Sequence, residues 1–278
     1  MRKPISTSVP QELVTQIDDF VKSSKGSYKD RSHLVEQALM FFLGENLSLH
    51  ESVSRAVSSG QNQDISSSMY ETSLFPRLAM NTCEKKAIAN LTANLIERGK
   101  TLFIDGSTTC IELAKVLTTQ RKGLTIVTNS TLICMELGHN REHKIIGVGG
   151  DYDSTSASFI GCDCEESVKR FYVDFAIFST KGFIPDEGTF ESTMGTLRVK
   201  QAVSQNCAKV ILLVDHTKFN QKSMCKVLDI SQIHTVITDD QAPGASIDLL
   251  RQNGHEVHIV ALESSKNRGE SNVFKASS

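Results

Sequence analysis

Hydrophobic residues from position 84 onward form short runs that alternate with longer segments in which apolar residues recur every three or four positions. The short runs are rich in β-branched residues and are bounded by Gly, Asp or Asn, so they predict buried strands. These runs are 102–104, 124–127, 145–148, 175–178, 210–214, 235–237 and 256–260. The segments between them predict helices, among them 84–98, 111–117 and 199–207. Such alternation predicts an α/β doubly wound domain with a mostly parallel sheet.

The first 46 residues have a different pattern. Residues 5–9 alternate as a short strand, Pro10 suits the first turn of a following helix, and a second apolar stripe appears after Gly26. A strand and two helices in about 45 residues cannot bury a core alone, so this module must dimerise. We therefore expect four parts, namely a module at 1–46, a polar linker at 47–82, the α/β domain at 83–263 and a disordered tail at 264–278.

Composition narrows the class of protein. The chain has 278 residues, a formal net charge of -2 and seven cysteines. No stretch has the roughly 18 uncharged apolar residues that a membrane span needs, and no signal peptide is visible, so we expect a cytoplasmic protein. Cys162 and Cys164 form the only close cysteine pair. Without a second pair or a nearby His, they do not predict a metal site.

Small and polar residues follow the predicted strands, where ligands bind in doubly wound sheets. Backbone N–H groups and hydroxyls at a helix start attract anions, and two of these strand ends add a lysine. The nucleotide-binding glycine fingerprints are absent. A small phosphorylated ligand is therefore the favoured interpretation, with no cofactor. The candidate residues are Asp105, Gly106, Ser107, Thr108, Thr109, Thr128, Asn129, Ser130, Gly149, Gly150, Lys181, Glu191 and Lys218.

The α/β region resembles the C-terminal effector domain of DeoR-type transcription regulators. The matching stretches are Glu84–Ala89, Phe103–Thr109, Val127–Ser130, Gly149-Gly150, Ser158–Gly161, Val173-Asp174, Asp215–Phe219 and Thr238–Asp240. The resemblance implies a fold shared with sugar-phosphate isomerases and a domain that senses a phosphorylated sugar or sugar derivative.

One departure from the family pattern concerns the predicted pocket. The family usually has a Glu four residues before the helix lysine, Lys200, and this sequence has Thr196 there. The preceding loop, 191–195, is altered as well. Glu191 could supply the missing carboxylate from a neighbouring position, or the pocket could bind a different ligand or none.

The N-terminal module resembles a ribbon-helix-helix domain, which replaces the winged helix-turn-helix expected of a DeoR-type regulator. The resemblance implies that paired strands enter the major groove and that a helix start binds phosphate. Residues 1–46 contain six basic and six acidic residues, so the module is not basic overall and modest DNA affinity is expected. The candidate DNA contacts are Arg2, Lys3, Ser6, Ser8, Lys29, Arg31 and Ser32.

These features predict a DNA-binding transcription regulator of carbohydrate metabolism genes, more specifically a repressor. Its expected partners are double-stranded operator DNA, a phosphorylated sugar effector, and further copies of itself in a homodimer or homotetramer. Three alternatives remain open. The chain could be a sugar-phosphate isomerase-like enzyme using Asp105, Glu191 and Asp215. Its sensor domain could only oligomerise, or the N-terminal module could be a dimerisation arm.

Overall fold

The computed structural model of the chain describes residues 74–120 and 123–262. The N-terminal module at 1–46, most of the linker at 47–82 and the tail at 264–278 lie outside the described residues, so their predicted boundaries stay predictions.

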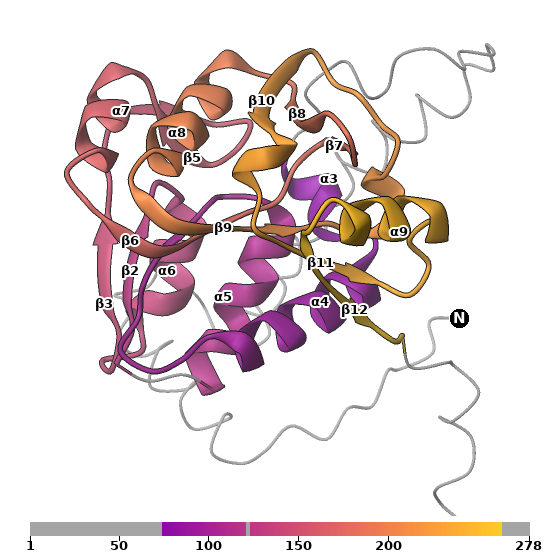
Figure 1. The fold of residues 1–278 in the computed structure, drawn as a ribbon. Helices are drawn as coiled ribbons and strands as arrows, with labels where there is room; N and C mark the ends of the chain where they lie inside the picture. The colour runs from indigo at the N-terminus through magenta and orange to yellow at the C-terminus, as the bar shows by residue number, and fades with distance from the viewer. Residues whose placement is uncertain (1–73, 121–122, 263–278) are drawn as a thin grey trace, which may run out of the picture. The chain divides into compact units, whose positions relative to one another are not determined.

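A seven-stranded sheet forms the centre of the described region, with the strand order β12-β11-β9-β6-β1-β2-β3 (Figure 1). All six of its strand pairings are parallel. This arrangement confirms the predicted α/β doubly wound domain. Its strands are β1 (Thr101–Ile104), β2 (Thr125–Thr128), β3 (Lys144–Gly147), β6 (Val173–Phe178), β9 (Cys207–Leu213), β11 (Thr235–Asp239) and β12 (Glu256–Val260).

Strand residues alternate between two hydrophobic cores, one on each face of the sheet. Leu102 and Ile104 of β1 pack into the core that includes residues of α4, α5 and α6, and Phe103 packs into the core that includes residues of α7, α8 and α9. Both faces are thus covered, which explains why the strands read as continuous apolar runs. The helices are α4 (Thr82–Leu95), α5 (Thr108–Gln120), α6 (Thr131–Gly138), α7 (Cys162–Val168), α8 (Met194–Ser204) and α9 (Gly244–Gln252).

Helix α8 is displaced from the predicted helix at 199–207. It begins at Met194 because the Thr193 side chain caps it, accepting a hydrogen bond from Thr196 N at 3.4 Å. The chain then enters β9 at Cys207, which pairs with Val173 of β6. Sheet pairing therefore overrides the helical pattern at the end of this segment.

Two small antiparallel units were not predicted from the sequence. A three-stranded sheet, in the order β10-β8-β7, is built from β7 (Gly182–Ile184), β8 (Gly188–Glu191) and β10 (Cys225–Asp229). Gly188 has a φ of 124°, and a Cβ there would clash with the backbone carbonyl of Leu228, so glycine is required. Strands β4 (Asp151–Asp153) and β5 (Ser158–Ile160) form a hairpin.

The end of the predicted linker is part of the folded domain. Helix α3 spans Leu74–Leu78, and a short turn at 79–81 leads from it into α4. Leu74 is fully buried, and its backbone N donates to Thr155 O at 2.9 Å. The polar composition of the preceding residues hid this anchor, so the folded region begins before the predicted boundary at 83.

Candidate functional site

A pocket of about 360 Å³ lies at the carboxyl ends of the central strands. Residues that follow β1, β2, β6 and β9 line its wall, as the doubly wound fold predicts. A volume of this size suits a small molecule rather than a dinucleotide. The lining also includes residues of α3, the β4–β5 hairpin, β8 and α8.

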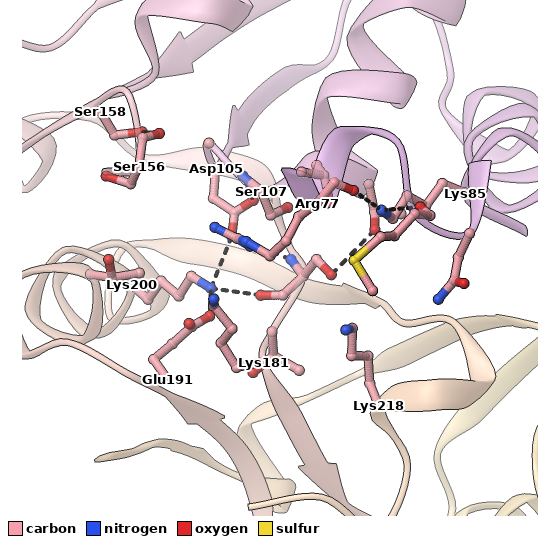
Figure 2. Close-up of a pocket in the computed structure, with 18 of the residues that line it drawn as sticks. Arg77, Lys85, Asp105, Ser107, Ser156, Ser158, Lys181, Glu191, Lys200 and Lys218 are labelled. Carbon is pink, nitrogen blue, oxygen red and sulfur yellow. Dashed lines mark hydrogen bonds and ion pairs between the residues drawn. The ribbon is translucent and has the colours of Figure 1, made fainter. Parts of the chain in front are cut away.

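A buried lysine joins two carboxylates at one end of the pocket (Figure 2). Lys200 Nζ lies 3.0 Å from Asp105 Oδ2, forms an ion pair with Glu191, and donates to Ser179 O at 2.6 Å. Asp105 also accepts hydrogen bonds from the backbone N of Ser107 at 3.0 Å and of Ser179 at 3.3 Å. We call Asp105, Glu191 and Lys200 the buried trio. It ties β1, β8 and α8 together beneath the ligand space.

The two carboxylates decide the protonation of the buried trio. Burial alone would lower the pKa of Lys200, but Asp105 and Glu191 outweigh it and raise that pKa above its usual value. Burial raises the pKa of Glu191, although Lys200 opposes this shift. Both pKa values rise because a single ammonium faces two carboxylates in a site with little water.

A second group of cationic residues lies at the opposite end of the pocket (Figure 2). Lys85, on α4, is 4% exposed and donates to Arg77 O at 2.6 Å and to Met80 O at 2.5 Å. Burial lowers the pKa of Lys85 to about 8, and the nearby carboxylate of Asp215 opposes this shift. Lys218 lies on the same side of the pocket, in the turn after β9.

The charge balance of the pocket favours an anion. Its lining contains five cationic residues and two carboxylates. Gly106, Ser107, Thr108 and Thr109 also line it where α5 begins, so the positive end of that helix dipole faces the ligand space. Lining hydroxyls from other elements supply neutral hydrogen-bonding groups, namely those of Ser156, Ser158, Ser179, Thr180, Thr196 and Thr217.

The structure brings nine of the candidate effector-binding residues to this wall. They are Asp105, Gly106, Ser107, Thr108, Thr109, Asn129, Lys181, Glu191 and Lys218. Glu191 contacts Lys200 directly, and Thr196, four residues before that lysine, also lines the pocket. Glu191 thus supplies one of the two carboxylates next to the helix lysine, and Asp105 supplies the other.

The other four candidates do not lie among the lining residues. Thr128 is fully buried and donates to Ile104 O at 2.7 Å, while Ser130 caps α6 by accepting from Ile133 N at 3.4 Å. A Cβ on Gly150 would meet Ile160 O and Cys164, so this residue permits close packing of the hairpin and α7, and its neighbour Gly149 is also outside the pocket lining. These residues shape the surrounding framework, because small residues at strand ends serve turns and caps as well as ligands.

Sequence reasoning missed the pocket roles of Lys85 and Lys200, although a signal was present. Lys85 shares the buried face of α4 with Ile88 and Ala89, and Lys200 shares the buried face of α8 with Leu197. A lysine inside an apolar helical stripe needs a buried partner or a polar cavity. Such a lysine therefore indicates a site.

The remaining sequence predictions concern other parts of the chain. The candidate DNA contacts lie outside the described residues. They are Arg2, Lys3, Ser6, Ser8, Lys29, Arg31 and Ser32. Cys162 is exposed and Cys164 is buried. No helix within 74–120 or 123–262 is long and apolar enough to cross a membrane.

Fold and pocket together define an α/β domain with a small pocket whose lining carries more cationic than anionic residues. Residues 80–240 match the family model described as the DeoR C terminal sensor domain. This match covers more than half of the chain, so the chain belongs to the family of the DeoR C-terminal sensor domain.

Two curated relatives are named as repressors. The chain is 33% identical over 164 residues to the transcriptional repressor AccR of Agrobacterium fabrum, covering 59% of this chain and 63% of that protein. It is also 33% identical over 197 residues to the glycerol-3-phosphate regulon repressor of Escherichia coli, covering 71% of this chain and 76% of that protein. The chain therefore spans less than two thirds of AccR and about three quarters of the E. coli protein.

Solved structures give a weaker likeness. A ribose-5-phosphate isomerase in complex with phospho-erythronic acid is 15% identical, with a TM-score of 0.37 over 49% of this chain and 52% of that chain. Nothing about the chemistry of this chain follows from that similarity.

Proposed function

We propose that this chain is a DNA-binding repressor of carbohydrate metabolism genes and that a phosphorylated sugar or polyol, bound in the described pocket, controls it. The curated relatives support the regulatory role, since they are named as repressors, one of them of a glycerol-3-phosphate regulon. The proposal includes no catalytic step. Ligand binding changes the affinity for DNA through linkage between two sites.

The charge and shape of the pocket carry the ligand part of the proposal. Its cationic excess and the start of α5 suit a phosphate, while the hydroxyl-bearing residues and the buried trio suit a polyhydroxylated body. Nine of the candidate effector-binding residues line this space, and we assign ligand contacts to them together with Arg77, Lys85 and Thr196.

Calorimetry on the full chain tests the ligand. sn-Glycerol 3-phosphate, ribose 5-phosphate and fructose 6-phosphate would be titrated beside glycerol, ribose and fructose. We expect at least one ester to bind, and its parent polyol or sugar to bind about 100-fold more weakly because charge-assisted hydrogen bonds are lost. Thr108→Val and Lys218→Met should each weaken binding, and Lys226→Met is the matched control, because Lys226 is exposed on β10 and does not line the pocket. Equal affinities for ester and parent compound would contradict the proposal.

The N-terminal module carries the DNA part of the proposal. We infer that residues 1–46 form a ribbon-helix-helix dimer whose strands read the major groove with Lys3, Ser6 and Ser8, while Arg2, Lys29, Arg31 and Ser32 contact phosphates. Dimerisation through this module makes the regulator at least a homodimer.

Fluorescence anisotropy on DNA upstream of the chain's own operon tests this inference. A triple alanine variant at Lys3, Ser6 and Ser8 should lose sequence preference, and Arg31→Ala should reduce the salt dependence of binding by about one phosphate contact. The control is Lys226→Met. Unchanged DNA affinity and sequence preference in both variants would show that the module does not contact DNA and would leave it as a dimerisation arm.

A further inference from the structure

Residues 74–81, which we call the strap, pass along the wall of the pocket before α4 begins. Pro76, Arg77, Met80 and Asn81 all line the pocket. At its start the strap is anchored by buried Leu74, whose backbone N donates to the carbonyl of Thr155, next to the pocket residue Ser156. Because residue 73 precedes it directly, the strap joins the sensor domain to everything N-terminal of it.

Asn81 anchors the other end of the strap. Its backbone is left-handed, with φ 48° and ψ 44°, a conformation that costs free energy for a residue other than glycine. Its side-chain amide donates to Asp215 Oδ1 at 3.2 Å and to Thr217 Oγ1 at 3.3 Å, in the turn that also presents Lys218 to the pocket. A strained residue therefore links the strap to a wall more than 130 positions away in sequence.

Lys85 fixes the strap between these ends. Two of its N–H donors go to the carbonyls of Arg77 and Met80, and the same side chain lines the pocket. Neutral carbonyls compensate a buried ammonium less well than a carboxylate or a phosphate does. An anion entering the pocket would therefore compete with the strap carbonyls for Lys85.

We propose that the strap is the element through which occupancy of the pocket is transmitted to the N-terminal part of the chain. This inference rests on the proposed function and adds the route by which ligand binding affects the N-terminal part of the chain. A ligand shifts a conformational equilibrium only by contacting its states differently. The strap meets that condition because Lys85, which binds two carbonyls of the strap, lines the pocket, as does Asn81 at the end of the strap.

Hydrogen–deuterium exchange on the full chain tests the proposal, with the three phosphate esters named above as probes at concentrations that calorimetry shows to saturate. Because the anion takes Lys85 from the carbonyls of Arg77 and Met80, we expect saturation to speed amide exchange in 74–81 at least about fivefold and to change exchange in 47–73 as well. No calorimetric binding of any ester would overturn the proposed function, and the inference with it. Binding without a change in 74–81, or without one in 47–73, would overturn the inference alone.

Variants separate transmission from binding. Asn81→Gly keeps the left-handed backbone but removes the amide that reaches Asp215 and Thr217. At saturation we expect it to abolish the exchange change in 47–73. Lys85→Met should abolish it too, whereas Lys86→Met, which alters the exposed neighbouring lysine on α4, should respond as the wild type does. A full response in Asn81→Gly and Lys85→Met would overturn the proposal.

Discussion

Lys85 and Lys200 lie at opposite ends of one pocket and are equally buried, each 4% exposed, yet their pKa values are shifted in opposite directions. Lys200 contacts two carboxylates, which raise its pKa, whereas Lys85 contacts two backbone carbonyls and its pKa falls to about 8. Burial alone therefore does not determine how a lysine behaves. The charge of the partners distinguishes a fixed lysine, Lys200, which two carboxylates hold, from Lys85, which we propose is responsive to a ligand.

Removing the fixed lysine should have the largest effect. Lys200→Met leaves Asp105 and Glu191 buried without their shared counter-ion, and we expect it to lower the free energy of unfolding by about 3–5 kcal/mol. Urea denaturation followed by circular dichroism measures the change. Lys226→Met is the matched control, because Lys226 pairs with Asp229 on the surface and should change stability by less than about 0.5 kcal/mol. A similar loss in both variants would contradict the comparison.

The two carboxylates of the buried trio should differ in their contributions. Asp105 accepts hydrogen bonds from Ser107 N and Ser179 N as well as contacting Lys200, so Asp105→Asn should cost about 2–3 kcal/mol. Glu191→Gln leaves Lys200 paired with Asp105 and should cost about 1 kcal/mol. The same urea experiment measures both values. The reverse order would show that Glu191 is the principal partner of Lys200.

The stability that Glu191 contributes should also depend on pH. Burial raises its folded pKa above the unfolded value of about 4.3, so folding favours its protonated form. The stabilisation that the protonated side chain gives to the folded state is fully present below a pH of about 4.3 and is lost as pH rises through the folded pKa. The difference in unfolding free energy between wild type and Glu191→Gln should therefore shrink from pH 4 to pH 7. A difference that grew over this range would mean that the folded pKa is lowered.

Replacing the responsive lysine should affect binding more than folding. Lys85→Met removes a buried charge near the ligand, and we expect phosphate-ester affinity to fall about tenfold, which corresponds to about 1.4 kcal/mol. Stability should change by less than about 1 kcal/mol, because the lost hydrogen bonds and the removed desolvation cost oppose each other. Calorimetry and urea denaturation give the two values, with Lys86→Met as the control. A stability loss as large as that of Lys200→Met would make the two lysines equivalent.

The smallest expected effect is the uptake of protons when a phosphate ester binds. Burial lowers the pKa of Lys85 to about 8. Lys218 and Arg77 also lower this pKa, whereas Asp215 and Glu112 oppose the shift. A phosphate beside it would raise that pKa, so binding at pH 8 should take up as much as about half a proton, and affinity should decrease above pH 8. Calorimetry in buffers of different ionisation enthalpy measures the uptake. Lys86→Met should retain it and Lys85→Met should lose it.

The parallel sheet could be predicted from the sequence because each strand has its own apolar run. Strands β7 and β8 could not, since they are three and four residues long and are held by antiparallel pairing of β7 with β8 and of β8 with the distant segment β10. The pocket edge was predicted because parallel strands place residues such as Asp105, Lys181 and Lys218 together. For Lys85 the sequence offered only its place in the apolar stripe of α4, because its partners are backbone carbonyls, which the sequence does not identify.

Strand order also constrains when the pocket can exist during synthesis. β1 lies between β2 and β6, and β6 is followed along the sheet by β9. A nascent chain that has reached Gly147 can pair β1, β2 and β3, but the other side of β1 stays open until Phe178 has emerged. The pocket wall further requires residues up to Gln221. The pocket can therefore bind a ligand only after nearly the whole sheet has been synthesised, and residues 1–73 leave the ribosome before that point.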